Sequence, residues 1–306
     1  QNLSARVTDA LGGVRVTETV RVTAYNPSTP QTTQWRGGTN AWSLPLAWSV
    51  GVPRAQDRGI IDSNGWALVG VGGGVVSNLV VGSGSSGRLT VDAATLRVGK
   101  SMLRGEGATG AGELEVRGEG TVMAASLNVG GNGVGKVVQR DGSVTANELL
   151  IAANAGSQGS YTLLGGVLVT KGLSVWGAPG ANGFVQSGGT NRVDGFLSVG
   201  PRSPRTGSYR MEGGLLSATG LRVSSGRSEE AVFELAGGTV AVSGVVQVGL
   251  EGQGRLGVRS GTMTLGSLAM GSAGVLDVQV GGDVPGLLVS GTATLRGRLV
   301  VRLPVG

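Results

Sequence analysis

The feature that most constrains the fold is a pattern that recurs about every 24 residues. A glycine opens an alternation of apolar and polar residues, and successive openings are 25, 23, 24, 24 and 24 residues apart: Gly87, Gly112, Gly135, Gly159, Gly183 and Gly207. The same position is then occupied by Ala231, Gly254 and Gly274. A period of this length is typical of repeat architectures in which each unit stacks on the next.

An apolar column lies two residues after each opening position. It reads Leu89, Leu114, Val137, Tyr161, Val185, Tyr209, Phe233, Leu256 and Leu276. A second column lies two residues further on and reads Val91, Val116, Gln139, Leu163, Ser187, Met211, Leu235, Val258 and Val278. Because alternate residues of a strand face the same side, we expect both columns to point inward from one strand.

A second signature, L-x-V-G or a close relative, closes each period. Its paired residues are Leu79 and Val81, Leu96 and Val98, Leu127 and Val129, Leu149 and Ile151, Leu173 and Val175, Leu197 and Val199, Leu221 and Val223, Val246 and Val248, and Leu268 and Met270. Between the two signatures lies a glycine-led stretch such as GGVLV at 165–169. The period therefore predicts three short strands.

Three strands and three turns in about 24 residues predict one coil of a parallel β-solenoid. Each strand would stack on its counterpart in the next coil at about 4.8 Å. A propeller blade needs about 40–50 residues, which is longer than this period. An antiparallel sandwich does not require columns this regular. We expect an all-β fold in which residues 65–306 form the solenoid.

The composition agrees with an aliphatic interior and removes many chemistries. The chain has 60 glycines without the every-third-residue glycine of collagen, and only 4% aromatic residues, so valine, leucine and alanine must fill the core. It has no cysteine and no histidine, which excludes disulfides, thiolate metal sites and Ser-His-Asp triads. We expect neither an enzyme nor a bound cofactor or metal.

The charge pattern argues against nucleic acid and membrane as partners. The net charge is +6, but the arginines are scattered and form no basic run. No apolar run of about 18 residues is present, so we expect no membrane insertion by this segment.

Tyr161 and Tyr209 fall in the inward column and are expected to fill the core rather than contact a ligand.

The first 26 residues depart from the repeat and predict a β-hairpin. Val14, Val16, Val20 and Val22 alternate with polar residues, and ALGG at 10–13 can form a turn. The segment is similar to the final hairpin of a bacterial immunoglobulin-like domain. Since an isolated hairpin is marginally stable in water, it needs a partner. Three interpretations stay open: a truncated upstream domain, packing on its own chain, or strand donation to a neighbouring subunit.

Residues 27–64 are rich in proline and tryptophan and are expected to form a linker and an N-terminal cap. Trp35, Trp42 and Trp48 are three of the five tryptophans and lie just before the first regular coil. Large rings at this place could cover the end of the apolar interior, and the same rings could form a stacking platform for a sugar.

The C-terminal stretch 286–306 keeps its alternation to the last residues. Leu299, Val301 and Leu303 would belong to a terminal strand that has no feature to prevent its edge from pairing with another strand. We expect that either the natural chain continues past Gly306 or another subunit covers this edge. Together with the hairpin valines, these residues are candidates for self-assembly.

Residues 35–306 resemble the β-helical passenger regions of autotransporter-like bacterial surface proteins. The likeness rests on VPRAQD at 52–57 after a tryptophan-rich opening, on the G-x-L-x-V, G-G-x-V and L-x-V-G order of the repeats, and on LLVSGTATLRGRLVV at 287–301. It implies an extracellular, right-handed parallel β-helix on the bacterial cell surface that works as a stalk, adhesin or fibre.

Parallel β-helices also include polysaccharide lyases, which carry clustered aspartates on one sheet. Here Asp92, Asp141 and Asp194 fall 5, 6 and 11 residues after their opening glycines and so share no column. The run of Glu106, Glu113, Glu115 and Glu119 is expected to be solvated surface. The predicted function is a non-enzymatic stalk or filament subunit that forms homo-oligomers. The alternative is a carbohydrate-binding adhesin or tail-spike-like module, with a surface glycan as its partner.

Overall fold

The computed structural model describes residues 2–3, 6–8, 14–16, 20–21, 29–154, 156–176, 183–200, 207–224, 230–280 and 286–303. Up to residue 28 it describes the backbone alone. The chain divides into two compact units, Gln1–Pro30 and Gln31–Gly306.

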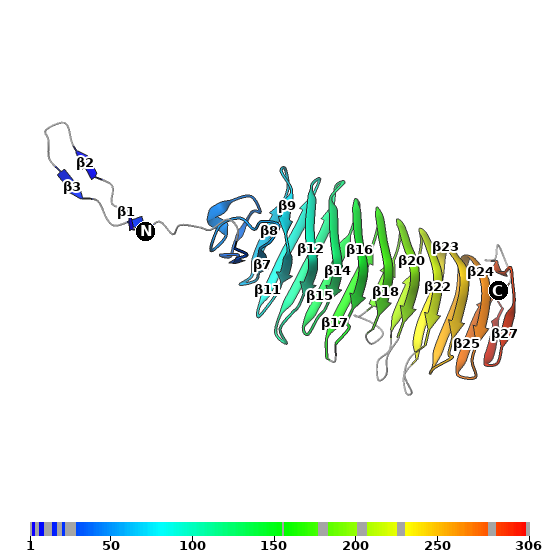
Figure 1. Cartoon of the computed structure of the whole chain (residues 1–306). Helices are drawn as coiled ribbons and strands as arrows, with labels where there is room; N and C mark the ends of the chain where they lie inside the picture. Colours follow the sequence, from blue (N-terminus) through cyan, green and yellow to red (C-terminus); the bar gives the residue numbers. More distant parts are fainter. Residues whose placement is uncertain are drawn as a thin grey trace. The chain divides into compact units, whose positions relative to one another are not determined.

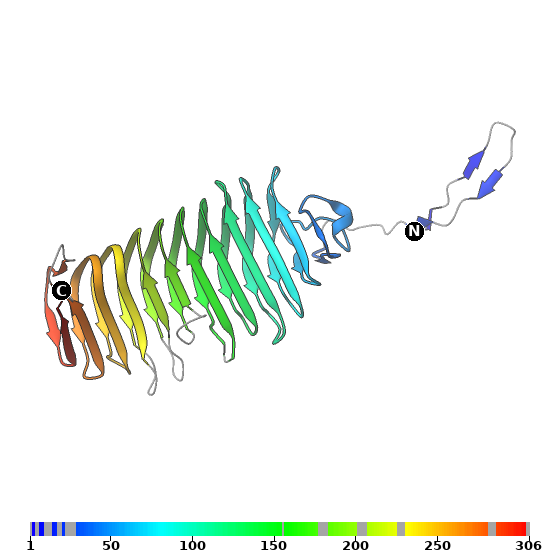
Figure 2. The same ribbon diagram turned by 180° about the vertical axis from the view of Figure 1, so that it is seen from behind.

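The second unit is a parallel β-solenoid of about ten turns, which confirms the predicted fold class. Its described strands form one continuous sheet of 24 strands in which each strand pairs in parallel with its equivalent one coil away (Figure 1). Figure 2 shows the same strands from behind, following one another along the axis in sequence order. For example, β13 (Ala111–Arg117) lies between β11 (Ser86–Asp92) and β15 (Val134–Gln139).

One wall of the solenoid, which we call face 1, contains the strand that opens each coil. Its strands are β6 (Thr39–Ala41), β8 (Gly65–Val69), β11, β13, β15, β17 (Gln158–Leu163), β19 (Gly183–Gln186), β21 (Ser208–Met211), the first parts of β23 (Ala231–Val248) and β24 (Gly254–Met270), β25 (Gly274–Gln279) and β28 (Arg298–Arg302).

The rest of each coil forms the other walls. Its strands are β5 (Thr32–Gln34), β7 (Arg58–Ile61), β9 (Gly74–Val76), β10 (Asn78–Val81), β12 (Thr95–Arg104), β14 (Thr121–Val129), β16 (Ser143–Ile151), β18 (Val167–Val175), β20 (Thr190–Val199), β22 (Leu215–Val223), the second parts of β23 and β24, β26 (Leu287–Val289) and β27 (Ala293–Leu295).

The second and third strands expected in each coil run on as one strand in most coils. Between β18 and β20, for instance, the pairing shifts between Thr170 and Leu173, which marks the bend. Separate strands appear at the two ends of the solenoid, as β9 and β10 in the first coils and β26 and β27 in the last. The predicted corner is therefore an irregularity in a continuous strand rather than a turn.

The interior consists of the predicted columns in register. Leu89 pairs with Leu114, Leu114 pairs with Val137, and all three are 0% exposed. The opening glycines lie at a corner where no side chain fits, since a Cβ on Gly87 would overlap the carbonyl oxygen of Ile61. The aliphatic packing and the glycine positions follow from the same repeat.

One part of the column assignment is wrong. Phe184, rather than Val185, pairs with Tyr161 and Tyr209, and its ring stacks on theirs with centroids 4.9 and 4.7 Å apart. In the same way Gln186 replaces Ser187 in the second column. The coil is one residue shorter than its neighbours suggest, and a slip of one residue exchanges the inward and outward faces of a strand.

A second assignment is also wrong. Leu96 pairs with Val122 and so belongs to the glycine-led strand, while Met102 occupies the position expected for Leu96 and pairs with Leu79. The letters L-x-V-G occur at 96–99, on the glycine-led strand, whereas the equivalent of Leu79 lies in MLRG at 102–105, so the local pattern pointed to the wrong strand.

The first unit contains antiparallel pairs. Strand β2 (Arg6–Thr8) pairs with β3 (Val14–Val16), and β1 (Asn2–Leu3) pairs with β4 (Val20–Arg21). The turn expected at ALGG, residues 10–13, lies outside the described residues. Of the four hairpin valines, Val22 lies outside the described residues.

Candidate functional surfaces

Carboxylates on face 1 are held in ion pairs by arginines of neighbouring coils. Glu115, expected at the solvated surface, is 5% exposed and lies between Arg140 at 2.7 Å and Arg88 at 2.8 Å. The hydrogen bond from Arg140, with a smaller contribution from Arg88, lowers the pKa of Glu115. The expectation of a solvated carboxylate is thus wrong here, because the register places two guanidinium groups against it.

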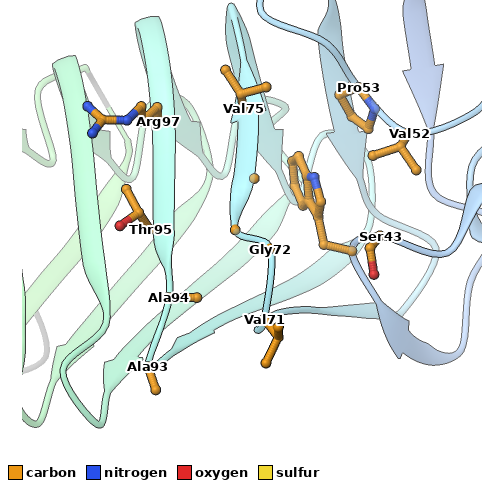
Figure 3. A pocket seen from close by; sticks show the side chains of 13 residues that line it. Ser43, Val52, Pro53, Val71, Gly72, Val75, Ala93, Ala94, Thr95 and Arg97 are labelled. Carbon is orange, nitrogen blue, oxygen red and sulfur yellow. The ribbon is translucent and has the colours of Figure 1, made fainter.

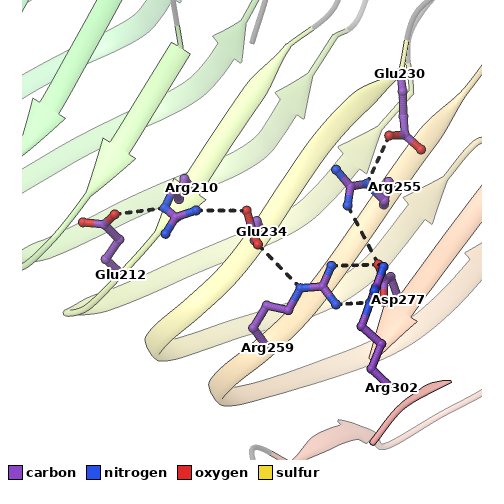
Figure 4. Close-up of polar contacts among 8 residues, drawn as sticks. All are labelled: Arg210, Glu212, Glu230, Glu234, Arg255, Arg259, Asp277 and Arg302. Atoms are coloured by element: carbon purple, nitrogen blue, oxygen red, sulfur yellow. Dashed lines mark hydrogen bonds and ion pairs between the residues drawn. The ribbon is translucent and has the colours of Figure 1, made fainter. Parts of the chain in front are cut away.

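A longer series of ion pairs crosses the C-terminal coils of face 1 (Figure 4). It joins Glu212, Arg210, Glu234, Arg259, Asp277 and Arg302, with Arg255 and Glu230 on its flank. Asp277 is 2% exposed and accepts hydrogen bonds from Arg302 and Arg259, which hold its pKa far below the usual value. The charges tie consecutive coils together.

These carboxylates do not suit general acid catalysis. A catalytic acid needs a pKa raised toward neutrality, whereas the pKa values of Asp57, Glu115 and Asp277 are lowered. Burial raises the pKa of Asp57, but hydrogen bonds from Arg54 and the Gln31 amide outweigh it. In the described part of the chain, no three potential metal-ligating side chains come together.

The aspartates singled out in the sequence lie on separate coils. Asp92 pairs with Arg117 at 2.9 Å and Asp194 pairs with Arg192 at 2.6 Å. Asp141 accepts a hydrogen bond from the amide of Gly142. The structure does not bring them together into a lyase-like cluster.

The three tryptophans of the segment 27–64 are buried in the first coil. Trp35, Trp42 and Trp48 are 2%, 2% and 1% exposed, and Trp48 meets the other two edge-to-face at 4.9 and 4.8 Å. The indole N–H of Trp48 donates to the carbonyl of Trp42 at 2.9 Å. Gly65 and Gly74 of the next coil leave room for the rings of Trp35 and Trp42. No ring face is open for a sugar to stack on.

The segment that holds these rings is itself part of the ladder. Strands β5, β6 and β7 pair in parallel with the following coils, and the short 3₁₀ helix η1 (Pro45–Ala47) carries the chain toward Trp48. The parallel pairing therefore begins at Thr32, inside the region expected to be a linker and cap.

The described N-terminal coils carry several open grooves, of which two are the best candidates for a ligand. The first, of about 660 Å³, is lined by Trp42, Val71, Arg97 and three consecutive glycines, Gly72 to Gly74 (Figure 3). It has no acidic lining residue. The side chain of Val71 is fully exposed beside it. This groove is shallow and offers few polar groups that could orient a ligand.

The second groove, of about 450 Å³, crosses face 1 and has charged residues of both signs in its lining. Its lining includes Trp66, Arg88, Glu113 and Lys136. The Arg88 guanidinium lies 4.2 Å from the centroid of the Trp66 ring, and the Trp66 indole N–H donates to the Thr90 hydroxyl at 2.9 Å. No motif marked this groove, because its residues come from successive coils.

Among the described residues, nothing covers the outer side of the last coil of the solenoid. Leu299 and Val301 continue the two inward columns of face 1, yet they are 53% and 55% exposed. Leu276, one coil earlier in the same column, is 4% exposed. Leu303 is 76% exposed. These three side chains form an exposed apolar group in the last described coil, and their use in assembly stays a prediction.

The chain matches no protein-family model, no curated protein and no solved structure. Among its described residues, no helix has the length and apolar character needed to cross a membrane. The β-solenoid assignment therefore rests on the strand register and the buried columns.

Proposed function

We propose that this protein is a non-enzymatic structural rod of the bacterial cell surface, in which the solenoid works as a rigid extracellular spacer or fibre subunit. The observation that carries the proposal is the apolar interior, which continues in register through about ten turns. Such a ladder makes length and stiffness its main properties. At about 4.8 Å per coil, the rod is about 48 Å long.

The polar contacts support the same function. Ion pairs such as Arg88 with Glu115 and Arg259 with Asp277 join different coils, so they resist bending and separation of the coils. Every carboxylate in these pairs is neutralised by arginine, which suits a scaffold better than a reaction centre. The extracellular location and the autotransporter-like character rest on the sequence resemblance and belong to this proposal.

The proposal includes assembly through the ends. The half-exposed Leu299 and Val301, with Leu303, provide an apolar edge that further polypeptide can cover. Deleting residues 1–26 tests the homotypic form of assembly, in which the hairpin valines contact a neighbouring copy. Loss of polymers after the deletion would support it, and unchanged polymers would reject it.

Removing coils tests the rod function directly. Deleting residues 112–158 joins Ala111 to Gly159 and keeps the register, because Ala111 and Gln158 occupy equivalent positions. Two coils are lost, so the long dimension should shorten by about 10 Å in small-angle X-ray scattering. A folded variant of unchanged length, or a full-length chain that scatters as a compact particle, would contradict the proposal.

A glycan-binding module is the second candidate, and the groove of Trp66 and Arg88 is the observation that favours it. Sugars bind to sites that combine an aromatic ring with charged hydrogen-bonding groups, and this groove has both. Glycan-array binding that is lost in Trp66→Ala but kept in Lys171→Ala, a change outside the groove, would support this candidate.

A further inference from the structure

Two arginines occupy the same outward position in different coils of the solenoid. Arg97 belongs to β12 and Arg192 to β20, and the strand pairing connects them step by step through Met123, Thr145 and Val169. Equivalent residues of a repeat have similar backbone surroundings. A difference between the two arginines therefore comes from the side chains around them.

Arg192 is neutralised within its own strand. Its guanidinium donates two hydrogen bonds to the Asp194 carboxylate, at 2.6 and 3.2 Å. Asp194 follows Val193, whose equivalent in β12 is Val98. Val98 is followed by Gly99. The acidic residue that neutralises one arginine is thus replaced by glycine beside the other.

Arg97 has an unused charge next to an open space. No carboxylate of the described residues lies within ion-pair distance of it, and its Nη1 lies 3.0 Å from the Met123 sulfur. The backbone does not require glycine at position 99, because its φ is outside the left-handed region. A Cβ there would come no closer than 3.8 Å to Ser77. The fold leaves room for a carboxylate where Asp194 lies in the later coil.

Arg97 also lies where two grooves adjoin. It lines the groove of about 660 Å³ shown in Figure 3 and a neighbouring groove of about 390 Å³ that includes Gly99 and Met123. Val75 lines both grooves as well, and the segment 52–55 contributes to both. Among the described lining residues of the two grooves, Arg97 alone is charged. A ligand that spans them meets one cation in an otherwise neutral surface.

The aliphatic lining indicates what the rest of the ligand is. Val75 and Met123 flank Arg97 in the same column and are 40% and 36% exposed, and the nearby Val71 is fully exposed. Covering such side chains with an apolar group is favourable. Phosphate or a sugar acid would leave them in water.

We infer that this surface binds a small amphipathic monocarboxylate, of which a medium-chain fatty acid is the simplest member. The Arg97 guanidinium binds the carboxylate over Gly99 through two hydrogen bonds, as Arg192 binds Asp194. The aliphatic chain crosses Val75 into the larger groove. Both grooves have volumes in the usual range for small ligands, about 300–1,000 Å³. The inference adds a ligand to the proposed rod and does not depend on the rod function.

Titration of the full chain with octanoate tests the inference. Neutral 1-octanol is the matched ligand, because it has the same chain length without the charge. Nuclear magnetic resonance of the Val75 and Met123 methyl groups reports binding at the site. Octanoate should bind roughly threefold to fivefold more tightly than 1-octanol, the range expected for an exposed ion pair, and high salt should reduce this preference.

Two pairs of variants isolate the charge. Arg97→Gln should remove the preference for octanoate, whereas Arg192→Gln, the matched change in the same column, should keep it. Gly99→Asp supplies the carboxylate that Arg192 already has and should also remove the preference. Gly99→Asn, of the same size but neutral, should keep it. Positions 97 and 99 are exposed, so these changes leave the core intact.

Three results would overturn the inference. The first is equal binding of octanoate and 1-octanol, or no methyl shifts with octanoate. The second is a preference for octanoate that persists in Gly99→Asp. The third is acetate that binds as tightly as octanoate, which would show that the site takes any carboxylate, including one on an acidic protein segment. The coil-deletion experiment uses no ligand, so each of these results leaves the rod proposal standing.

Discussion

The two ends of the solenoid start from the same repeat and are finished in different ways. At the N-terminal end Trp48 is 1% exposed and packs against two other indole rings. At the C-terminal end Leu299 is 53% exposed although it continues a column that is buried from Ala67 to Leu276. The comparison shows that the repeat builds the interior but does not close it. Closure needs added large side chains or another polypeptide.

The transition from buried to exposed takes place within one coil. Leu256 is 0% exposed, Leu276 is 4% exposed and Leu299 is 53% exposed along one column. Each coil therefore depends on contacts with its nearest neighbours, as in other one-dimensional repeat proteins. The predictions below measure how different the ends are, from the largest effect to the smallest.

Trp48→Ala should destabilise the N-terminal end most. The substitution removes a fully buried ring, two edge-to-face contacts and a hydrogen bond to Trp42. The expected loss is about 3–5 kcal/mol in the free energy of unfolding. Denaturant unfolding followed by tryptophan fluorescence measures it. A loss below about 1 kcal/mol would mean that the rings do not close this end.

Asp277→Asn should destabilise the coils next to the open end. It leaves Arg259 and Arg302 without their shared carboxylate, and breaking such a buried ion pair costs roughly 3 kcal/mol. Arg302 is 55% exposed, so water and salt screen part of this effect. Hydrogen exchange in β25 and β28 reports the loss locally. Unchanged exchange in both strands would show that the pair contributes nothing to the end.

Low pH should reduce the stability of the same coils. The pKa of Asp277 is lower in the folded chain than in the unfolded chain. Its contribution is therefore fully present above the unfolded pKa of about 4 and is lost as the pH falls below that value. Stability measured from pH 6 to pH 2 should fall less steeply in Asp277→Asn than in the wild type. Parallel curves would contradict this assignment.

Tyr209→Phe provides a mid-solenoid reference for both ends. The Tyr209 hydroxyl donates to Gln186 at 2.7 Å and accepts from Asn191 at 3.0 Å, and all three residues are 0% exposed. Removing the oxygen leaves the side-chain oxygen of Gln186 and the side-chain NH2 of Asn191 without their Tyr209 partner, at a cost of about 1–3 kcal/mol. Thermal unfolding of the variant tests this. A neutral result would mean that the amides find other partners.

Leu299→Ala should have the smallest effect. About half of the side chain is already exposed, so its loss should cost less than about 1 kcal/mol. The matched change Leu276→Ala, one coil inward, should cost about 2–5 kcal/mol. Equal losses at the two positions would show that the end is covered in solution.

Much of the interior could be predicted from the sequence, because one column position repeats in every coil. Leu89 and Leu114 were placed correctly for this reason. The sequence pattern places Val185 rather than Phe184 in the column because it takes Gly183 as an opening glycine, equivalent to Gly159. In the structure Gly183 pairs with Ser160, one residue further along. Only the stacking of the aromatic rings distinguishes the two registers, and stacking depends on three coils at once.

The surface features were harder to predict. Glu115 is buried between Arg88 and Arg140, which come from the coils before and after it. The groove of Trp66 likewise draws its residues from several coils. Such features depend on which residues of neighbouring coils lie opposite each other. A local sequence pattern does not give that pairing.

Hydrogen exchange coil by coil tests the central claim most directly, namely that the tryptophan rings close the interior in the first coil while none of the described residues covers β28. The account predicts strong protection of β13 in the middle, measurable protection of β8 beside the tryptophans, and fast exchange on the outer edge of β28. Protection of β28 equal to that of β13 in the isolated chain would contradict the claim.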